Sequence, residues 1–138
     1  MLVEVQALVT PTTHPQPRRS VRGVDAGRVH QLLAVLERHG GLSSAGHEVY
    51  VNVVGGVRVV EPAADLAVAL SIASSVRDRA LGPVAAWGEV GLTGEIRSVP
   101  MRTTRAEEAA RLGISHHIAP NGDGPGRLLE ALEAASLV

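Results

Sequence analysis

Hydrophobic and polar residues alternate at the start of the chain. Residues 2–9 are rich in Val and Leu, with Glu4 and Gln6 at alternating positions, which predicts a half-buried strand. A Pro-rich stretch, TPTTHPQPRRS, follows and predicts an extended loop. A second short strand is expected to run through Val24.

From Asp25 onward, apolar residues recur at helical spacing. They form one stripe of an amphipathic helix: Val29, Leu32, Leu33 and Leu36. We expect Asp25 to be the N-cap residue and Gly40-Gly41 to end the helix.

The middle of the chain predicts a hairpin and a second helix. The run EVYVNVV, the turn at Gly55-Gly56 and the run VRVV indicate a hairpin over residues 48–60. Pro62 then opens a helix that is expected to reach about Arg79.

The last third of the chain again mixes strands and helices. VAAWGEV and GEIRSV predict two strands joined through residues 91–93, as a second hairpin or a bent, paired ribbon. Residues 101–112 predict a helix that buries Ala106, Ala109 and Ala110. ISHHIAP predicts a short strand, and a final helix uses Leu128, Leu129 and Leu132. Residues 1–138 therefore predict a single α/β (α+β) domain with a mixed sheet and packed helices.

The entrance of the second helix, EPAAD, contains two carboxylates four residues apart. Glu61 and Asp65 share one face of a helix, near its positive N-terminal end. We favour a structural role in which each binds free backbone N–H groups or pairs with an Arg, and we expect such partners beside Asp65 if it is buried. The alternative is that one of them is an active-site acid with a raised pKa.

Composition excludes several kinds of chemistry. The chain is 45% hydrophobic and 1% aromatic, has no Cys, and carries a net charge of −1. Disulfides, thiolate catalysis and Cys-bound zinc are therefore excluded, and charge gives no general attraction to nucleic acid. No apolar run of about 18 residues is present, so we expect a cytoplasmic domain without a membrane partner.

All 13 basic residues are Arg, and no Lys occurs. A guanidinium does not act as a neutral amine base, and a phosphate-binding P-loop requires a Lys. The glycine-rich stretches are therefore interpreted as tight turns. The six His residues show no metal-binding spacing, so no metal site is predicted.

Four arginines lie close together in the sequence: Arg18, Arg19, Arg22 and Arg28. Because Arg binds phosphate oxygens with two N–H groups, this cluster is a candidate contact for nucleic acid. Solvated charge and a subunit contact explain it equally well. Arg102 and Arg105 are further candidates for nucleic-acid binding.

Two stretches resemble a known family: VNVVGGVRVVEPAADLAVALSIASS and WGEVGLTGEIRSVPMRTTRAEEAARLGI. They are similar to the C-terminal Lon-protease-like domain of the RadA (Sms) family of bacterial DNA repair proteins, over nearly the whole chain. The resemblance implies a fold like domain 2 of ribosomal protein S5. It also implies that a zinc finger and a RecA-like ATPase precede this domain, so ATP, Mg and Zn are expected only there.

The same resemblance implies a role and partners. Family members are hexameric ring ATPases that drive branch migration in recombinational repair, and this domain is thought to be a hexamer scaffold and a DNA-binding surface. Single-stranded or branched DNA, further copies of the chain, and recombinase or other replication and repair proteins are the implied partners.

Comparison with the Lon proteases themselves implies that the catalytic Ser-Lys dyad is lost. Ala63 falls at the position of the nucleophilic serine, and Thr103 at that of the lysine. The domain is therefore expected to be non-catalytic. Two alternatives remain: a purely structural oligomerisation module, or a peptidase that uses Ser43, Ser44 or Ser71 with a His.

Overall fold

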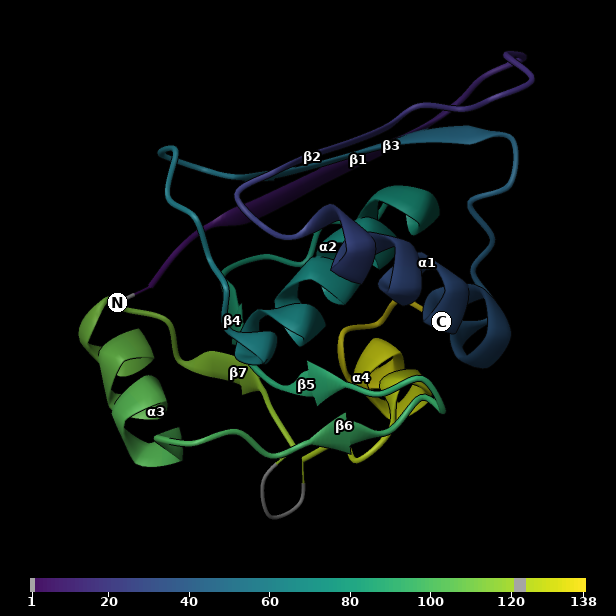
Figure 1. The fold of residues 1–138 in the computed structure, drawn as a ribbon. Coiled ribbons are helices and arrows are strands. Elements are labelled where there is room, and N and C mark those ends of the chain that lie inside the picture. The colour runs from purple at the N-terminus through teal and green to yellow at the C-terminus, as the bar shows by residue number, and fades with distance from the viewer. Residues whose placement is uncertain (1, 121–123) are drawn as a thin grey trace.

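The computed structural model describes residues 2–120 and 124–138, with the backbone alone for residues 102 and 103. Figure 1 shows the order of the elements along the chain. They are β1 (Val5–Pro11), β2 (Arg19–Arg22), α1 (Ala26–Gly40), β3 (His47–Val53), the 3₁₀ turn η1 (Pro62–Ala64), α2 (Asp65–Arg77), β4 (Val84–Ala86), β5 (Glu89–Val90), β6 (Ile96–Arg97), α3 (Arg102–Arg111), β7 (His116–Ile118) and α4 (Leu128–Ala134). This is a mixed α+β fold, as the sequence predicts.

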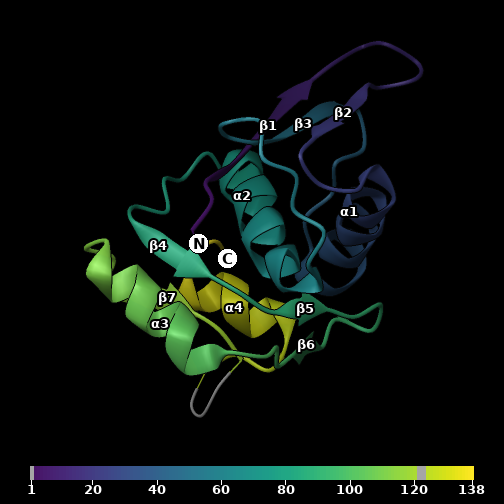
Figure 2. The ribbon, with the colours of Figure 1, turned by 60° about the vertical axis from the view of Figure 1, so that its left-hand side comes forward.

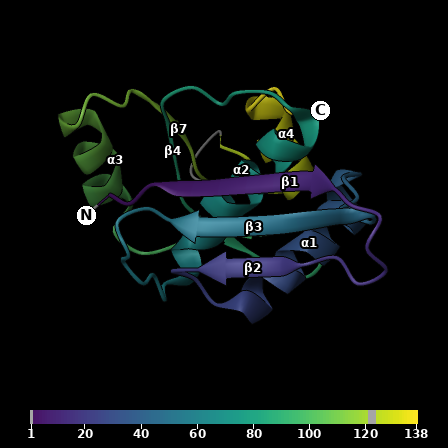
Figure 3. The ribbon, with the colours of Figure 1, turned by 90° about the horizontal axis from the view of Figure 1, so that it is seen from above.

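The first three strands form a mixed sheet in the order β1-β3-β2. β1 is antiparallel to β3, and β2 is parallel to it. Helix α1 connects β2 to β3, because two parallel strands need a crossover rather than a tight turn. Figure 3 shows the strands side by side, with the helices beneath them.

Helices α1 and α2 cover one face of this sheet, and the remaining elements lie on their far side (Figures 1 and 2). β4 pairs with β7, and β5 pairs with β6. The large core lies between these layers. Its fully buried side chains are Leu36, Leu66, Leu70, Ile72, Leu128, Leu132, Leu137, Val29, Val49, Val51 and Val53.

Both ends of α1 match the prediction from sequence. The Asp25 side chain accepts a hydrogen bond from the Arg28 backbone N–H at 3.0 Å, which is an N-cap contact. Gly41 adopts a left-handed conformation (φ 67°) and ends the helix.

The hairpin predicted for residues 48–60 is wrong. β3 is the central strand, with β1 on one edge and β2 on the other, so neither edge can accept residues 57–60. After the turn this segment instead runs past the end of β2, where Val59 N–H donates to the Gly23 carbonyl at 2.6 Å.

The second helix begins later and ends earlier than predicted. Pro62 starts a 3₁₀ turn, the α-helix itself runs from Asp65 to Arg77, and Asp78 ends it in a left-handed conformation (φ 52°).

The predicted strand VAAWGEV is divided into two at Trp87-Gly88. β4 pairs in parallel with β7, whereas β5 forms the expected hairpin with β6 through the turn at residues 91–94. The chain changes partner at this point because the Gly88 backbone is bound elsewhere. Its N–H donates to the Ala63 carbonyl at 2.9 Å, and its carbonyl accepts from Leu66 N–H at 3.1 Å.

A small second cluster packs beneath α3. It consists of Trp87, Ala85, Ala109 and Ala119. Ala106 is half-buried and Ala110 is exposed, so the predicted burial of Ala110 is wrong. No helix in the described part of the chain has the length and apolar character needed to cross a membrane.

Candidate nucleic-acid interface

The entrance of α2 provides no nucleophile at Ala63. Its methyl group is only 5% exposed, and its carbonyl accepts the hydrogen bond from Gly88. Thr103, which the resemblance to Lon proteases places at the lysine position, has its side chain outside the described residues, as does Arg102. Because Ala63 has no hydroxyl group and the chain has no Lys, these two positions cannot form a Ser-Lys pair.

Asp65, the first residue of α2, is 3% exposed and fully engaged. Arg28 Nε donates to Oδ1 at 2.8 Å, and Arg28 Nη2 donates to Oδ2. Val90 N–H of β5 also donates to Oδ2, at 3.1 Å. The structure thus places both an arginine and a backbone N–H beside this carboxylate.

This ion pair determines the electrostatics of Arg28. The pKa of its guanidinium is raised, chiefly by the hydrogen bond to Asp65 and by the negative charge of that residue, against the opposing effect of burial. A bidentate Arg–carboxylate pair is geometrically specific. Arg28 therefore belongs to the packing of α1 on α2.

Glu61 lies on the surface beside the buried pair. Arg105 Nη2 of α3 donates to its Oε2 at 3.2 Å, and Arg105 also binds the Pro100 carbonyl. The Glu61 side chain is 67% exposed, so this contact is a solvated ion pair.

The three candidate serine hydroxyls have no histidine partner among the described residues. Ser71 Oγ donates to the Ala67 carbonyl at 2.8 Å, and Ser43 Oγ donates to Glu37 at 3.3 Å. Ser44 is buried, and its backbone carbonyl accepts a contact from Arg19. Nothing here resembles a catalytic triad.

The four clustered arginines point in different directions. Arg19 is turned to the His47 and Ser44 carbonyls, and Arg28 is held by Asp65. Arg18 and Arg22 are exposed. Because Arg22 is in register with Asn52 on β3, it lies on the outer face of the sheet, away from the helices.

The Tyr50 side chain also lies on that outer face, a position that the spacing of the arginines alone does not predict. Tyr50 is in register with Leu8 of β1 and Ser20 of β2. Its hydroxyl donates to Glu48 Oε1 at 2.9 Å. This hydrogen bond is the main cause of a raised Tyr50 pKa, and nearby Arg18 opposes it. The alternation in EVYVNVV is the signal that places Tyr50 opposite the buried valines.

The outer face therefore combines two arginines, one aromatic ring and several amide and hydroxyl groups, with Glu48 as a partly neutralising charge. Guanidinium groups bind phosphate oxygens, and the half-buried Tyr50 ring offers a partial stacking surface for a base. In residues 2–120 and 124–138, no three His, Asp or Glu side chains are grouped to hold a metal ion.

Comparison with known proteins gives a consistent result. The chain is 48% identical over 134 residues to the DNA repair protein RadA of Escherichia coli (strain K12). It is 49% identical over 127 residues to the protein of the same name from Bacillus subtilis (strain 168), and 45% identical over 145 residues to that from Brucella abortus (strain 2308). Nearly the whole chain is therefore homologous to part of the proteins named DNA repair protein RadA.

The match covers nearly all of this chain but a small part of each RadA protein. It includes 96% of the chain and 29% of the Escherichia coli protein, and 90% and 28% for the Bacillus subtilis protein. The chain thus spans less than a third of these RadA relatives, which is consistent with one C-terminal domain of that family. No protein-family model matches the chain.

Proposed function

We propose that this chain is a non-catalytic domain of a DNA repair protein of the RadA type. It contacts single-stranded or branched DNA and helps to assemble its protein into a ring, most simply a hexamer. Its relatives are named as DNA repair proteins, which supports the biological setting. Any ATP, Mg or Zn that the longer protein uses would bind outside this region, and its recombinase or repair partners would act on the assembled ring.

The absence of peptidase chemistry is part of the proposal. Ala63 offers a buried methyl group at the entrance of α2, and Asp65 is saturated by Arg28 and Val90. In this proposal the entrance of α2 serves to pack α2 against α1 and β5. Its sequence similarity to a peptidase site then reflects a shared fold rather than a shared activity.

The DNA contact rests on one observation: Arg18 and Arg22 face solvent on the same open sheet as Tyr50. Two phosphate contacts and one stacking ring support weak binding that falls with added salt. Arg19 is not part of this surface, because its guanidinium binds backbone carbonyls inside the fold.

Titration of a fluorescent oligonucleotide at several salt concentrations tests the DNA contact. We expect R18A/R22A to weaken binding at least about tenfold at low salt and to reduce the slope of log K against log salt by about 1 to 2. The matched control is R38A/R111A, which removes the same charge from exposed positions on α1 and α3. Equal loss in both double variants would show that only overall charge matters, and the sheet-face proposal would be wrong.

A further inference from the structure

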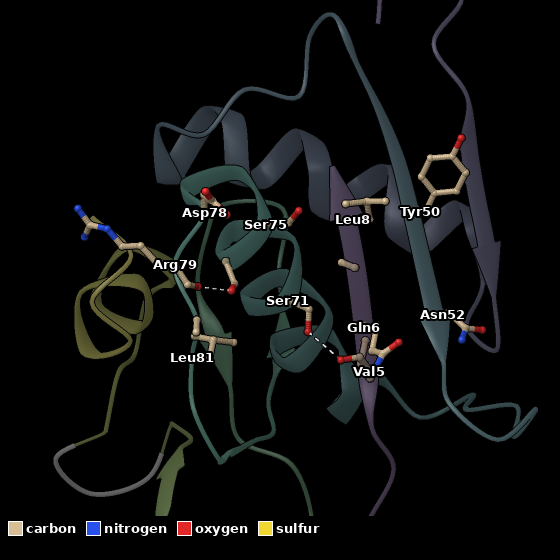
Figure 4. A pocket seen from close by; sticks show the side chains of 13 residues that line it. Val5, Gln6, Leu8, Tyr50, Asn52, Ser71, Ser75, Asp78, Arg79 and Leu81 are labelled. Atoms are coloured by element: carbon tan, nitrogen blue, oxygen red, sulfur yellow. Dashed lines mark hydrogen bonds between the residues drawn. The ribbon is translucent and has the colours of Figure 1, made fainter. Parts of the chain in front are cut away.

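β1 is an edge strand, and its outer edge faces an open groove. The groove has a volume of about 990 Å³ and lies between β1 and the C-terminal half of α2. Figure 4 shows it with Val5 and Leu8 on the strand, and Ser71, Ser75 and Asp78 on the helix side. In the described part of the chain, no strand pairs with this edge of β1.

The backbone groups that point into the groove can be identified from their contacts. Glu4 carbonyl and Thr12 N–H bind the chain on the β3 side. In an antiparallel pair, successive residues direct their N–H and C=O groups alternately toward and away from the partner strand. Residues 5, 7 and 9 therefore face the groove, and the contact of Val9 N–H with Ser75 Oγ, at 2.8 Å, agrees with this.

Two serines of α2 satisfy part of this edge. Val9 N–H donates to Ser75, and the Val5 carbonyl accepts from Ser71 Oγ at 3.4 Å. The remaining groups have no partner among the described residues: Val5 N–H, Ala7 N–H, Ala7 C=O and Val9 C=O. The serine side chains are short, so the backbone of an added strand can approach them.

The four remaining groups are complementary to themselves under a two-fold rotation. If Ala7 of one copy lies opposite Ala7 of another in antiparallel register, the two residues exchange both of their hydrogen bonds. Val5 then lies opposite the second copy's Val9, and each Val5 N–H can donate to a Val9 carbonyl. A regular ladder would also pair the Val9 N–H of one copy with the Val5 carbonyl of the other, but these two groups are already bound by Ser75 and Ser71.

We propose that the free edge of β1 pairs with β1 of a second copy of this chain, in antiparallel register centred on Ala7. The pairing makes four backbone hydrogen bonds and joins the two sheets into one. It also brings together the two exposed Leu8 side chains, each 55% exposed in the single chain, as diagonal neighbours on the outer face. Such a two-fold contact closes on itself, unlike a head-to-tail contact. It does not depend on the proposed DNA contact.

Disulfide trapping tests the register in a chain that has no cysteine of its own. In this register residue 6 of one copy faces residue 8 of the other, a non-hydrogen-bonded pair whose Cα atoms lie about 4.5 Å apart, within reach of a disulfide. We expect Q6C/L8C to form a covalent dimer under mild oxidation. The single variants Q6C and L8C are the matched controls and should cross-link far more slowly, since neither residue faces itself.

The mass of the chain as a function of concentration, measured by sedimentation, tests the hydrogen bonds. Ala7→Pro removes an N–H that β3 does not use, and proline is tolerated on an edge strand with its nitrogen facing outward. We expect this variant to weaken dimerisation about tenfold or more, whereas Ala7→Val keeps it. If A7P does not fold, the cross-linking result still tests whether two copies pair in this register. Three results would each overturn the proposal. The first is a monomer at all concentrations with no rapid Q6C/L8C cross-link, and the second is a dimer that A7P leaves unchanged. The third is an unrelated extended peptide that occupies the groove of a monomer.

Discussion

Asp65 joins three elements through a single carboxylate: α1 through Arg28, its own helix α2, and β5 through Val90. Its local sequence predicts an anion at a helix N-terminus that needs a partner. The identity of that partner lies beyond local reasoning, because Arg28 is 37 residues away and reaches Asp65 only through the packing of α1 against α2. Because this contact holds Arg28 against Asp65, Arg28 does not share a surface with Arg18 and Arg22, although the three are close together in the sequence.

Removing this carboxylate should be strongly destabilising. Asp65→Ala leaves the buried Val90 N–H and the Arg28 guanidinium, whose side chain is 35% exposed, without their acceptor, so we expect the free energy of unfolding to fall by about 2–3 kcal/mol. Glu61→Ala is the matched control. Its carboxylate is exposed and pairs with Arg105, so its loss should cost less than about 1 kcal/mol. Urea denaturation measures both, and equal small losses would contradict the role given to Asp65.

The elements differ in how far their sequences determine them. Helix α1 is predictable at both ends, because Asp25 and Gly41 act locally on the backbone. The hairpin expected after β3 does not form, although its Gly-Gly turn is present, because strand pairing depends on which edges are free. Pairing partners are set by the whole sheet, and turn residues alone do not reveal them.

Gly88 marks the junction at which β4 and β5 take different partners. A Cβ atom at this position would lie 2.7 Å from Ile96 Cγ2 and 3.3 Å from Pro120 Cδ. We expect Gly88→Ala to lower the free energy of unfolding by about 1–3 kcal/mol, because the closely packed β6 side chain must move. Gly126→Ala is the matched control, since an added Cβ there meets no atom within 4 Å. Thermal unfolding followed by calorimetry compares them, and similar midpoints would show that the junction tolerates a side chain.

The distribution of apolar side chains divides the molecule into two cores of unequal size. The large one lies between the three-stranded sheet, α1, α2 and α4, whereas α3 rests on a small cluster of alanines around Trp87. The Trp87 indole N–H is buried with no hydrogen-bond partner among the described residues, and its ring stacks on exposed His117 at a centroid distance of 5.2 Å. A region with little buried apolar surface opens at a lower free energy than the rest of the chain.

Trp87 is the only tryptophan, so its fluorescence reports on the small cluster alone, while circular dichroism at 222 nm reports mainly on the helices of the large core. In urea we expect the fluorescence midpoint to precede the circular dichroism midpoint. Ala109→Gly, in the last turn of α3, removes a buried methyl group and up to about 1 kcal/mol of helix propensity. It should lower the fluorescence midpoint and leave the circular dichroism midpoint nearly unchanged. Ala34→Gly, at an exposed position of α1, should do the reverse. Coincident transitions that shift together in both variants would mean that the two cores unfold as one cooperative unit, with α3 as firmly held as the sheet.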